Sequence, residues 1–229
     1  MNEFVEKGLR LFPQYFRDLI GLLTGPKRFV AVRLQEPGLF EGSLLFLAFS
    51  YVSGFILKVP TYTGDLLTEL GAGAAFTLLQ AVGFGIAIWI AWRAVGGRGA
   101  LGENLAISLY YAGVLELLMT FMYVTLIGTI RTGDAPLYTR LLESAHNGTI
   151  VQLLSQVDRL LESRAFRLAL LMELPFIAAG IVWVVAGWGG YRVQHGVTKP
   201  RSVVAFFLSA IFAIPVAALT FLAANGLVR

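Results

Sequence analysis

The sequence contains no cysteine, which excludes disulfides, thiolate catalysis and metal sites built on cysteine. Its two histidines, His146 and His195, are too few for a histidine cluster. Charged residues are also scarce: they make up 14% of the chain, against about 25% in a typical soluble domain. Because 57% of the 229 residues are hydrophobic instead, we expect a large part of the surface to face lipid.

Signatures of catalysis and of nucleic-acid binding are missing as well. The sequence shows no phosphate-binding loop, no dinucleotide fingerprint and no clustered metal ligands. Its aspartates lie outside the apolar stretches and both histidines lie in loops, which excludes the usual intramembrane protease pairs. The net charge of +4 is spread over many loops, with no basic run of the length that nucleic acid needs. We therefore expect no enzyme, no cofactor, no metal site and no nucleic-acid partner.

Five segments are long and apolar enough to cross a bilayer, which takes roughly 20 residues. They cover about 42–57, 71–92, 105–128, 168–190 and 202–226. The first is the shortest, and its flanking Glu41 and Lys58 can extend toward the membrane surfaces. The expected fold class is all-α: a polytopic membrane protein with a bundle of five transmembrane helices. We divide it into an N-terminal segment, 1–41, and a five-span membrane domain, 42–229.

The orientation is predicted from lysine and arginine, which favour the inner side of a membrane. With the N-terminus inside, the inner segments hold eleven basic residues and the outer segments seven. Tryptophans end the second and the fourth span on the same side, as interfacial anchors do; these are Trp89, Trp92, Trp183 and Trp188. We expect a bacterial cytoplasmic (inner) membrane protein with its N-terminus inside and its C-terminus outside.

Residues 2–24 are predicted to form an amphipathic helix. Apolar residues recur at helical spacing; they are Val5, Leu9, Phe12, Phe16, Leu19, Ile20 and Leu23. Such a helix either lies on the inner membrane surface or packs on the underside of the bundle. Pro13 favours a break near the first turn.

The loop 131–166 is predicted to be a helical outer region. Asp134 and Pro136 open a short helix, and Thr149 with Gln152 has the spacing of a capping box before a second one. These helices cover the outer mouth of the bundle, rest on the membrane interface, or offer a surface to a partner.

Two hairpins share one layout. The stretches "IWIAWRAVGGRGALGENLAISLYYAGVLEL" and "IVWVVAGWGGYRVQHGVTKPRSVVAFFLSAIFAI" each join a tryptophan-ended span, a Gly-Gly turn, a basic loop and another span. This pattern predicts an internal repeat in parallel orientation. The alternative is that two membrane hairpins of similar composition look alike.

Three stretches carry a family resemblance: "LIGLLTGPKRFVAVRLQEPG", "GGRGALGENLAISLYYAG" and "HGVTKPRSVVAFFLSAIFAIP". With them the chain resembles the bacterial branch of the Yip (Ypt-interacting protein) domain family, over about 20–225 without the outer loop. The resemblance implies five spans and an inner N-terminus. Eukaryotic members bind prenylated Rab-type GTPases, but their "DLYGP" and "GYS" signatures are not intact here, so that role does not carry over.

Small residues recur four apart on two spans and predict close helix packing. On the second span these are Gly73, Thr77, Ala81 and Gly85; on the fifth they are Ala205, Ser209, Ala213 and Ala217. We expect both ridges to be buried. Pro175 and Pro215 are expected to kink the fourth and fifth spans.

Two glutamates lie inside apolar spans, where a carboxylate needs a partner, a proton or a function. Helical rotation places Glu116 and Glu173 on faces with small or polar neighbours, turned toward other helices. The candidate intramembrane polar site comprises Glu116, Glu173, Tyr51, Gln80, Thr120 and Tyr123. The acids are either neutral groups whose hydrogen bonds join helices, or a relay or binding site for protons or cations.

The function expected from these features is that of a non-enzymatic integral membrane protein resembling the Yip family. It would bind other membrane proteins or shape the bilayer, with lipids as partners, and a homo-oligomer is compatible with it. The alternative is a small transporter, or the accessory subunit of an exporter, that uses the intramembrane carboxylates.

Overall fold

The computed structural model of the chain describes residues 3–61, 65–147 and 157–227. This part of the chain is all-α, as the sequence predicts. Five of its helices are long and apolar enough to cross a membrane: Leu39–Thr61, Leu66–Ala94, Leu101–Gly133, Arg164–His195 and Lys199–Thr220. The protein is therefore an integral membrane protein with a bundle of five candidate spans.

Two helices precede the first span: α1, Glu3–Thr24, and α2, Pro26–Arg33. Pro13 lies inside α1, so the predicted break is wrong. A proline removes a single backbone hydrogen bond, and the helical bonds on either side keep the helix continuous. At the next turn Pro26 is the first residue of α2, where its fixed φ suits a helix start.

The spanning helices extend beyond the apolar stretches. The first, α3, is Leu39–Lys58, followed by the short helix η1, Val59–Thr61. Asp65 caps α4, Leu66–Ala94, by accepting a bond from the Thr68 N–H at 3.1 Å. The remaining helices are α5, Leu101–Gly133; α6, Ala135–Asn147; α8, Val157–Glu162; α9, Arg164–His195; and α10, Lys199–Leu227.

The chain divides into two compact units. The first comprises Met1–Leu117 and Val182–Arg229, and the second comprises Leu118–Ile181. The helices α5 and α9 each contribute one part to each unit. The helices α1 and α2 belong to the same unit as α3, α4 and α10, and do not form a unit of their own.

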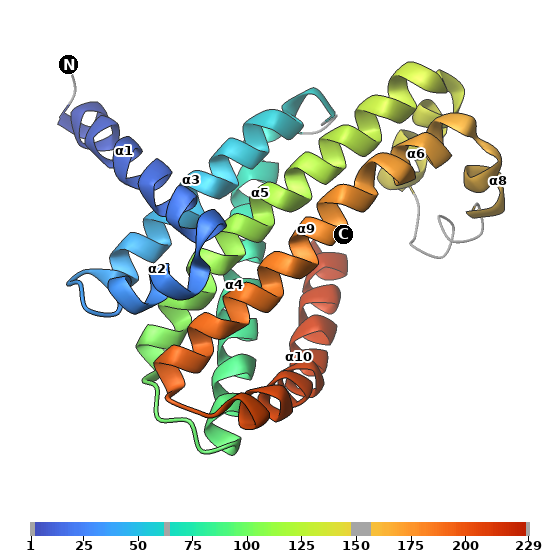
Figure 1. Cartoon of the computed structure of the whole chain (residues 1–229). Helices are drawn as coiled ribbons and strands as arrows, with labels where there is room; N and C mark the ends of the chain where they lie inside the picture. Colours follow the sequence, from blue (N-terminus) through green and yellow to red (C-terminus); the bar gives the residue numbers. More distant parts are fainter. Residues whose placement is uncertain (1–2, 62–64, 148–156, 228–229) are drawn as a thin grey trace. The chain divides into compact units, whose positions relative to one another are not determined.

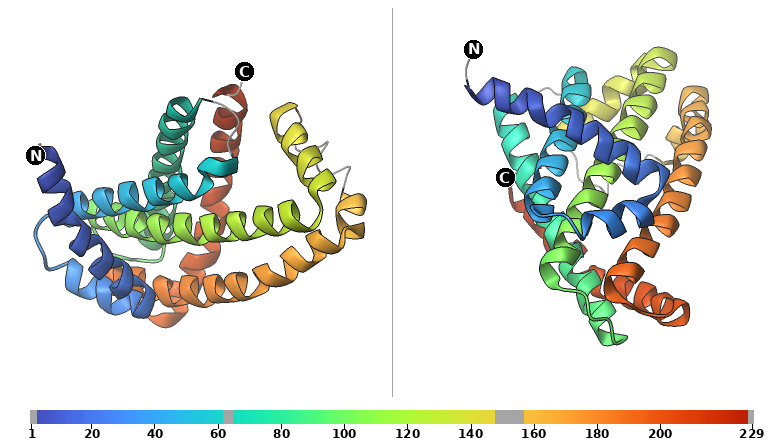
Figure 2. Two further views of the ribbon diagram at one scale, coloured as in Figure 1. Left: turned by 90° about the horizontal axis from the view of Figure 1, so that it is seen from above. Right: turned by 60° about the vertical axis from the view of Figure 1, so that its left-hand side comes forward.

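In the first unit α4 and α10 lie side by side (Figures 1 and 2). A Cβ on Gly83 would lie 2.7 Å from Val216 Cγ1 of α10, so only glycine allows this approach. The predicted ridges show a range of exposure: Ala81, Gly85, Ala205 and Ser209 are buried, Gly73, Thr77 and Ala213 are half-buried, and Ala217 is exposed. The expectation of burial is therefore wrong at Ala217.

The ridge of α4 contacts different helices along its length. A Cβ on Gly73 would overlap the Tyr51 hydroxyl of α3, and one on Gly85 would lie 3.0 Å from Ser108 of α5. The small residues of α4 thus allow three helices to pack closely against it: α3 at Gly73, α5 at Gly85 and α10 at Gly83.

The turns of the two similar hairpins meet in the first unit. The Arg98 N–H donates to the His195 carbonyl at 3.2 Å, and Gln194 Nε2 donates to the Ala100 carbonyl at 3.0 Å. Trp92 stacks on His195 and on Trp188, with ring centroids 5.2 and 5.0 Å away. Trp92 is fully buried, so the prediction of an interfacial anchor is wrong for this residue.

The second unit contains α6, α8 and the adjoining parts of α5 and α9. Its core is apolar: Ile130, Leu137, Leu160 and Ala169 are buried together. Asp134 caps α6 as predicted, accepting bonds from the Leu137 N–H at 3.0 Å and the Ser163 hydroxyl at 2.7 Å. The predicted capping box at Thr149 and Gln152 lies outside the described residues.

Candidate functional site

Glu116 of α5 has a cationic partner. Lys58 Nζ, at the end of α3, donates to Glu116 Oε1 at 2.8 Å, and the two side chains are 20% and 17% exposed. The sequence directed Lys58 to the membrane surface. This expectation is corrected by the ion pair, which places a charged contact between two spanning helices.

The other predicted polar residues are divided between the two compact units. Tyr51 is buried and its hydroxyl donates to the Leu70 carbonyl at 3.2 Å, while Gln80 is half-buried. These two belong to the first unit with Glu116. Thr120 is fully buried and Tyr123 is exposed, and both belong to the second unit with Glu173.

Glu173 of α9 is 5% exposed, and neither of its carboxylate oxygens has a hydrogen-bond partner among the described residues. The predicted packing of its face holds at Ala169 and Gly180, which are both buried. The predicted hydrogen bond between helices is not observed at this residue. Glu173 is thus a buried polar side chain without a hydrogen-bond partner in the described part of the chain, an arrangement that costs stability.

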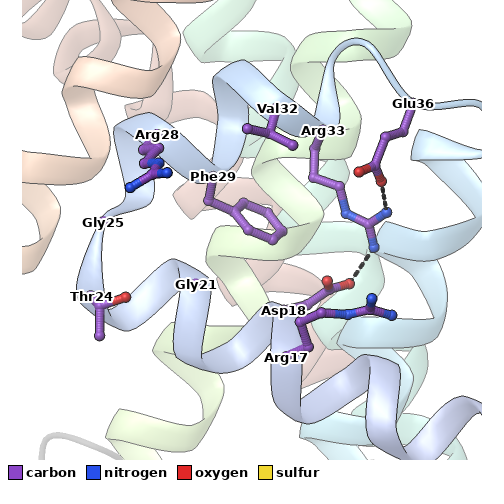
Figure 3. Close-up of a pocket in the computed structure, with 10 residues that line it drawn as sticks. All are labelled: Arg17, Asp18, Gly21, Thr24, Gly25, Arg28, Phe29, Val32, Arg33 and Glu36. Atoms are coloured by element: carbon purple, nitrogen blue, oxygen red, sulfur yellow. Dashed lines mark hydrogen bonds and ion pairs between the residues drawn. The ribbon is translucent and has the colours of Figure 1, made fainter.

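A pocket that the sequence did not predict lies between α1 and α2, outside the spans; we call it the α1–α2 pocket (Figure 3). Its volume is about 610 Å³. Side chains and backbone from both helices and from the turns beside them line it: Arg17, Asp18, Gly21, Thr24, Gly25, Arg28, Phe29, Val32, Arg33 and Glu36. The lining therefore combines charged groups with two large apolar side chains, Phe29 and Val32.

The pocket exists because both helices are held on the first unit. Tyr15 and Leu22 of α1 are buried; the Tyr15 hydroxyl lies 3.3 Å from Ser50 Oγ, and Trp183 Nε1 donates to the Leu22 carbonyl at 2.9 Å. Val30 of α2 is also buried. These contacts hold both helices on the rest of the first unit, and the pocket lies between the two helices.

Both carboxylates of the pocket are directed at Arg33. Its guanidinium lies 2.5 Å from Asp18 Oδ2 and also pairs with Glu36. Tyr110 donates to Asp18 from 3.4 Å. Burial lowers the pKa of Arg33, but the bond to Asp18 and the charges around it outweigh that effect and raise the pKa above its ordinary value. Arg33 is therefore permanently charged, and its guanidinium group is paired with Asp18 and Glu36.

Arg17 and Arg28 differ from Arg33. Both side chains are exposed, and neither has an ion-pair partner in the part of the chain that the structure describes. Arg17 extends from α1 and Arg28 from α2 (Figure 3). The lining thus holds three arginines against two carboxylates, an excess of one positive charge, and Arg17 and Arg28 are the arginines that make no ion pair among the described residues.

The face of α1 turned away from the unit is apolar. We call its large side chains, Phe12, Phe16, Ile20 and Leu23, the α1 stripe; they are between 44% and 59% exposed. The opposite face carries buried Tyr15, Asp18 and Leu22. Of the two predicted placements of this helix, packing against the bundle is confirmed, and contact with the membrane surface stays a prediction supported by the stripe.

The α1–α2 pocket was missed because no helix was predicted after residue 24. The signal was present: charged residues flank Gly25 and Pro26 on both sides, and a helical hairpin at this turn brings them together. An eight-residue helix is too short for its periodicity to be recognised, so the hairpin was not inferred.

In the described residues, no group of three or more His, Cys, Asp or Glu side chains is arranged to hold a metal ion. Comparisons of the chain with known protein families, curated proteins and solved structures find no match.

Proposed function

We propose that this chain is a non-enzymatic integral membrane protein that acts on the lipid bilayer through the helix pair α1 and α2. One observation carries the proposal: α1 is fixed to the first unit by one face and exposes the α1 stripe on the other. An apolar face on a helix beside transmembrane spans has the chemistry of an interfacial membrane helix.

The energetics support this role. Burying one large apolar side chain contributes about 1.5–3 kcal/mol, and the α1 stripe offers four such side chains. Because α1 is joined to membrane spans, it is already at the bilayer and loses little translational freedom when it inserts. A shallowly inserted helix occupies headgroup area in one leaflet only, and this asymmetry favours curvature. We place α1 at the inner leaflet of a bacterial cytoplasmic membrane.

The test is the shape of liposomes that contain the purified protein. We expect wild-type protein to produce vesicles of smaller diameter in electron micrographs than protein-free controls. The double variant Phe16→Glu with Ile20→Glu adds charge to the α1 stripe and should lose this effect. A control with Gln35→Glu and Thr198→Glu adds the same charge at exposed positions outside the stripe. Equal diameters for all three proteins would reject the proposal.

A transporter, or the accessory subunit of an exporter, is the second candidate. It is favoured by the Lys58–Glu116 pair and by Glu173, which are ionisable groups inside spans. Flux or lipid-flipping assays in liposomes test it, because Glu116→Gln should abolish transport. Neither glutamate lines the α1–α2 pocket, so the two candidates depend on different residues.

Membership of the Yip family, and binding to other membrane proteins or to a second copy, remain proposals beside these two. They are compatible with a role at the bilayer, since such a partner can contact the exposed faces of the spans. Chemical crosslinking in native membranes, followed by identification of the joined chains, tests them.

A further inference from the structure

The lining of the α1–α2 pocket carries three arginines and two carboxylates, so its formal net charge is positive, +1. Its acids are occupied by Arg33, whereas Arg17 and Arg28 carry charge without an acidic partner among the described residues. The guanidinium group presents planar pairs of N–H donors that match the oxygens of phosphate. The pocket volume of about 610 Å³ lies within the range of about 300–1,000 Å³ for small-ligand sites.

Backbone donors lie at the same place. Gly25 precedes α2 and makes no side-chain cap, so the first-turn N–H groups of Lys27 and Arg28 have no capping partner. The positive end of the α2 dipole adds to the field of the two arginines. Gly25 and Arg28 both line the pocket, which brings these donors to its edge.

Apolar side chains border the charged groups. Val32 lines the pocket and is exposed, and Ile20 and Leu23 of the α1 stripe are next to the lining residues Gly21 and Thr24. A free phosphate has no apolar part that could bury such a surface, whereas a phospholipid carries acyl chains close to its phosphate. Charge and apolar surface together therefore select a lipid.

We propose that the α1–α2 pocket binds the phosphate headgroup of an anionic phospholipid of the inner leaflet, an inference that rests on the proposed function. Arg17 binds the phosphate oxygens from α1, and Arg28 binds them from α2. Arg33, which pairs with Asp18 and Glu36, holds the two helices in place. The lipid acyl chains lie along the α1 stripe.

The test is equilibrium binding of a phosphatidylglycerol with a fluorescent acyl chain, followed by anisotropy in uncharged detergent micelles. The double variant Arg17→Gln with Arg28→Gln should bind roughly tenfold more weakly or worse, since each lost bond to a charged group is a large one. The matched control, Arg98→Gln with Lys199→Gln, removes two exposed positive charges elsewhere and should bind like wild type. Equal affinity of the double variant and the control overturns the proposal.

Two further measurements are needed. A competition experiment separates lipid phosphate from soluble phosphate, and a conservative double variant shows whether a loss of binding reflects misfolding. Glycerol phosphate should not compete at lipid concentrations; if it does, the site binds soluble phosphate and the lipid assignment fails. The variant Arg17→Lys with Arg28→Lys keeps the charge but loses the planar donor pairs, and should bind with intermediate affinity.

The failure of this inference is distinguishable from failure of the proposed function. If phosphatidylglycerol binding does not depend on Arg17 and Arg28 while Phe16→Glu with Ile20→Glu still abolishes the vesicle effect, only the headgroup site is wrong. If the vesicle effect is absent in wild type while binding depends on both arginines, the bilayer role is wrong and the lipid site stands.

Discussion

Glu116 in the first unit and Glu173 in the second are both carboxyl groups inside membrane spans, yet their surroundings are opposite. Glu116 accepts a bond from the Lys58 ammonium group at 2.8 Å. Glu173 is more deeply buried, and its oxygens have no hydrogen-bond partner in the described part of the chain. One acid contributes to the packing of two helices, and the other costs stability where it lies.

This difference shows that depth in a span does not determine the role of an acid. Both glutamates lie on faces with small neighbours, and both are costly in lipid. What separates them is a lysine 58 positions away in the sequence, which α3 brings to α5. The effect of removing each group should therefore differ in sign.

The largest effect is expected for Lys58→Met. This change removes the Lys58 counter-charge from the Glu116 carboxylate; because the pair is only partly buried, the cost is up to about 3 kcal/mol, the lower end of the range for fully buried pairs. The free energy of unfolding, measured by titration with a denaturing detergent, should fall accordingly. The double variant Lys58→Met with Glu116→Gln should recover most of the loss. Strict additivity of the two single changes would show that the pair contributes nothing.

A smaller change of opposite sign is expected for Glu173→Met. Methionine has similar volume and removes two buried oxygens that have no hydrogen-bond partner among the described residues, so the free energy of unfolding should rise by about 1–3 kcal/mol. Glu116→Met is the matched control and should lower it, because Lys58 then loses its partner. A destabilised Glu173→Met protein would reveal a partner for the carboxyl group. A stabilised variant that has lost transport would favour the second candidate function.

The smallest effect concerns Asp134, an acid of the second unit that lies outside the spans and has its partners. The Ser163 hydroxyl and the Leu137 N–H hold its pKa below the ordinary value. Its contribution to stability is therefore complete at neutral pH and is lost as pH falls through the lowered pKa.

Asp134→Asn keeps an acceptor for the helix but does not titrate. Thermal midpoints measured between about pH 7 and about pH 3 should fall less steeply in this variant than in wild type. Identical slopes would show that Asp134 does not contribute to the acid sensitivity. Together with the Glu173 variant, this measurement compares two acids of the same unit: Asp134, which has hydrogen-bond partners, and Glu173, which has none in the residues that the structure describes.

The fold was largely predictable because lipid imposes a simple rule on sequence. A helix that crosses a bilayer needs a long apolar run, and all five runs are found in helices. Their ends were less well predicted: the run at 105–128 belongs to a helix that spans Leu101–Gly133. Hydropathy marks the part inside hydrocarbon, whereas backbone hydrogen bonds continue into polar residues.

The candidate sites were predictable only in part. Glu116 and Glu173 are recognised because acids are rare in spans, but the partner of Glu116 depends on how α3 packs on α5. The α1–α2 pocket depends on contacts distant in sequence, such as that between Asp18 and Tyr110. A periodic pattern describes one helix at a time, so it contains no information about such pairs.

The anchoring of α1 has a consequence for the order in which the protein assembles. Tyr110, which bonds Asp18, is made 92 residues later, and Trp183, which bonds the Leu22 carbonyl, 161 residues later. At about 5–20 residues per second, a ribosome needs roughly 5–18 s to reach the first of them and roughly 8–32 s to reach the second. During that interval α1 lacks these two contacts, whereas its contact with α3 through Tyr15 and Ser50 forms early. The α1 stripe keeps this helix on the bilayer surface until the later spans have been inserted.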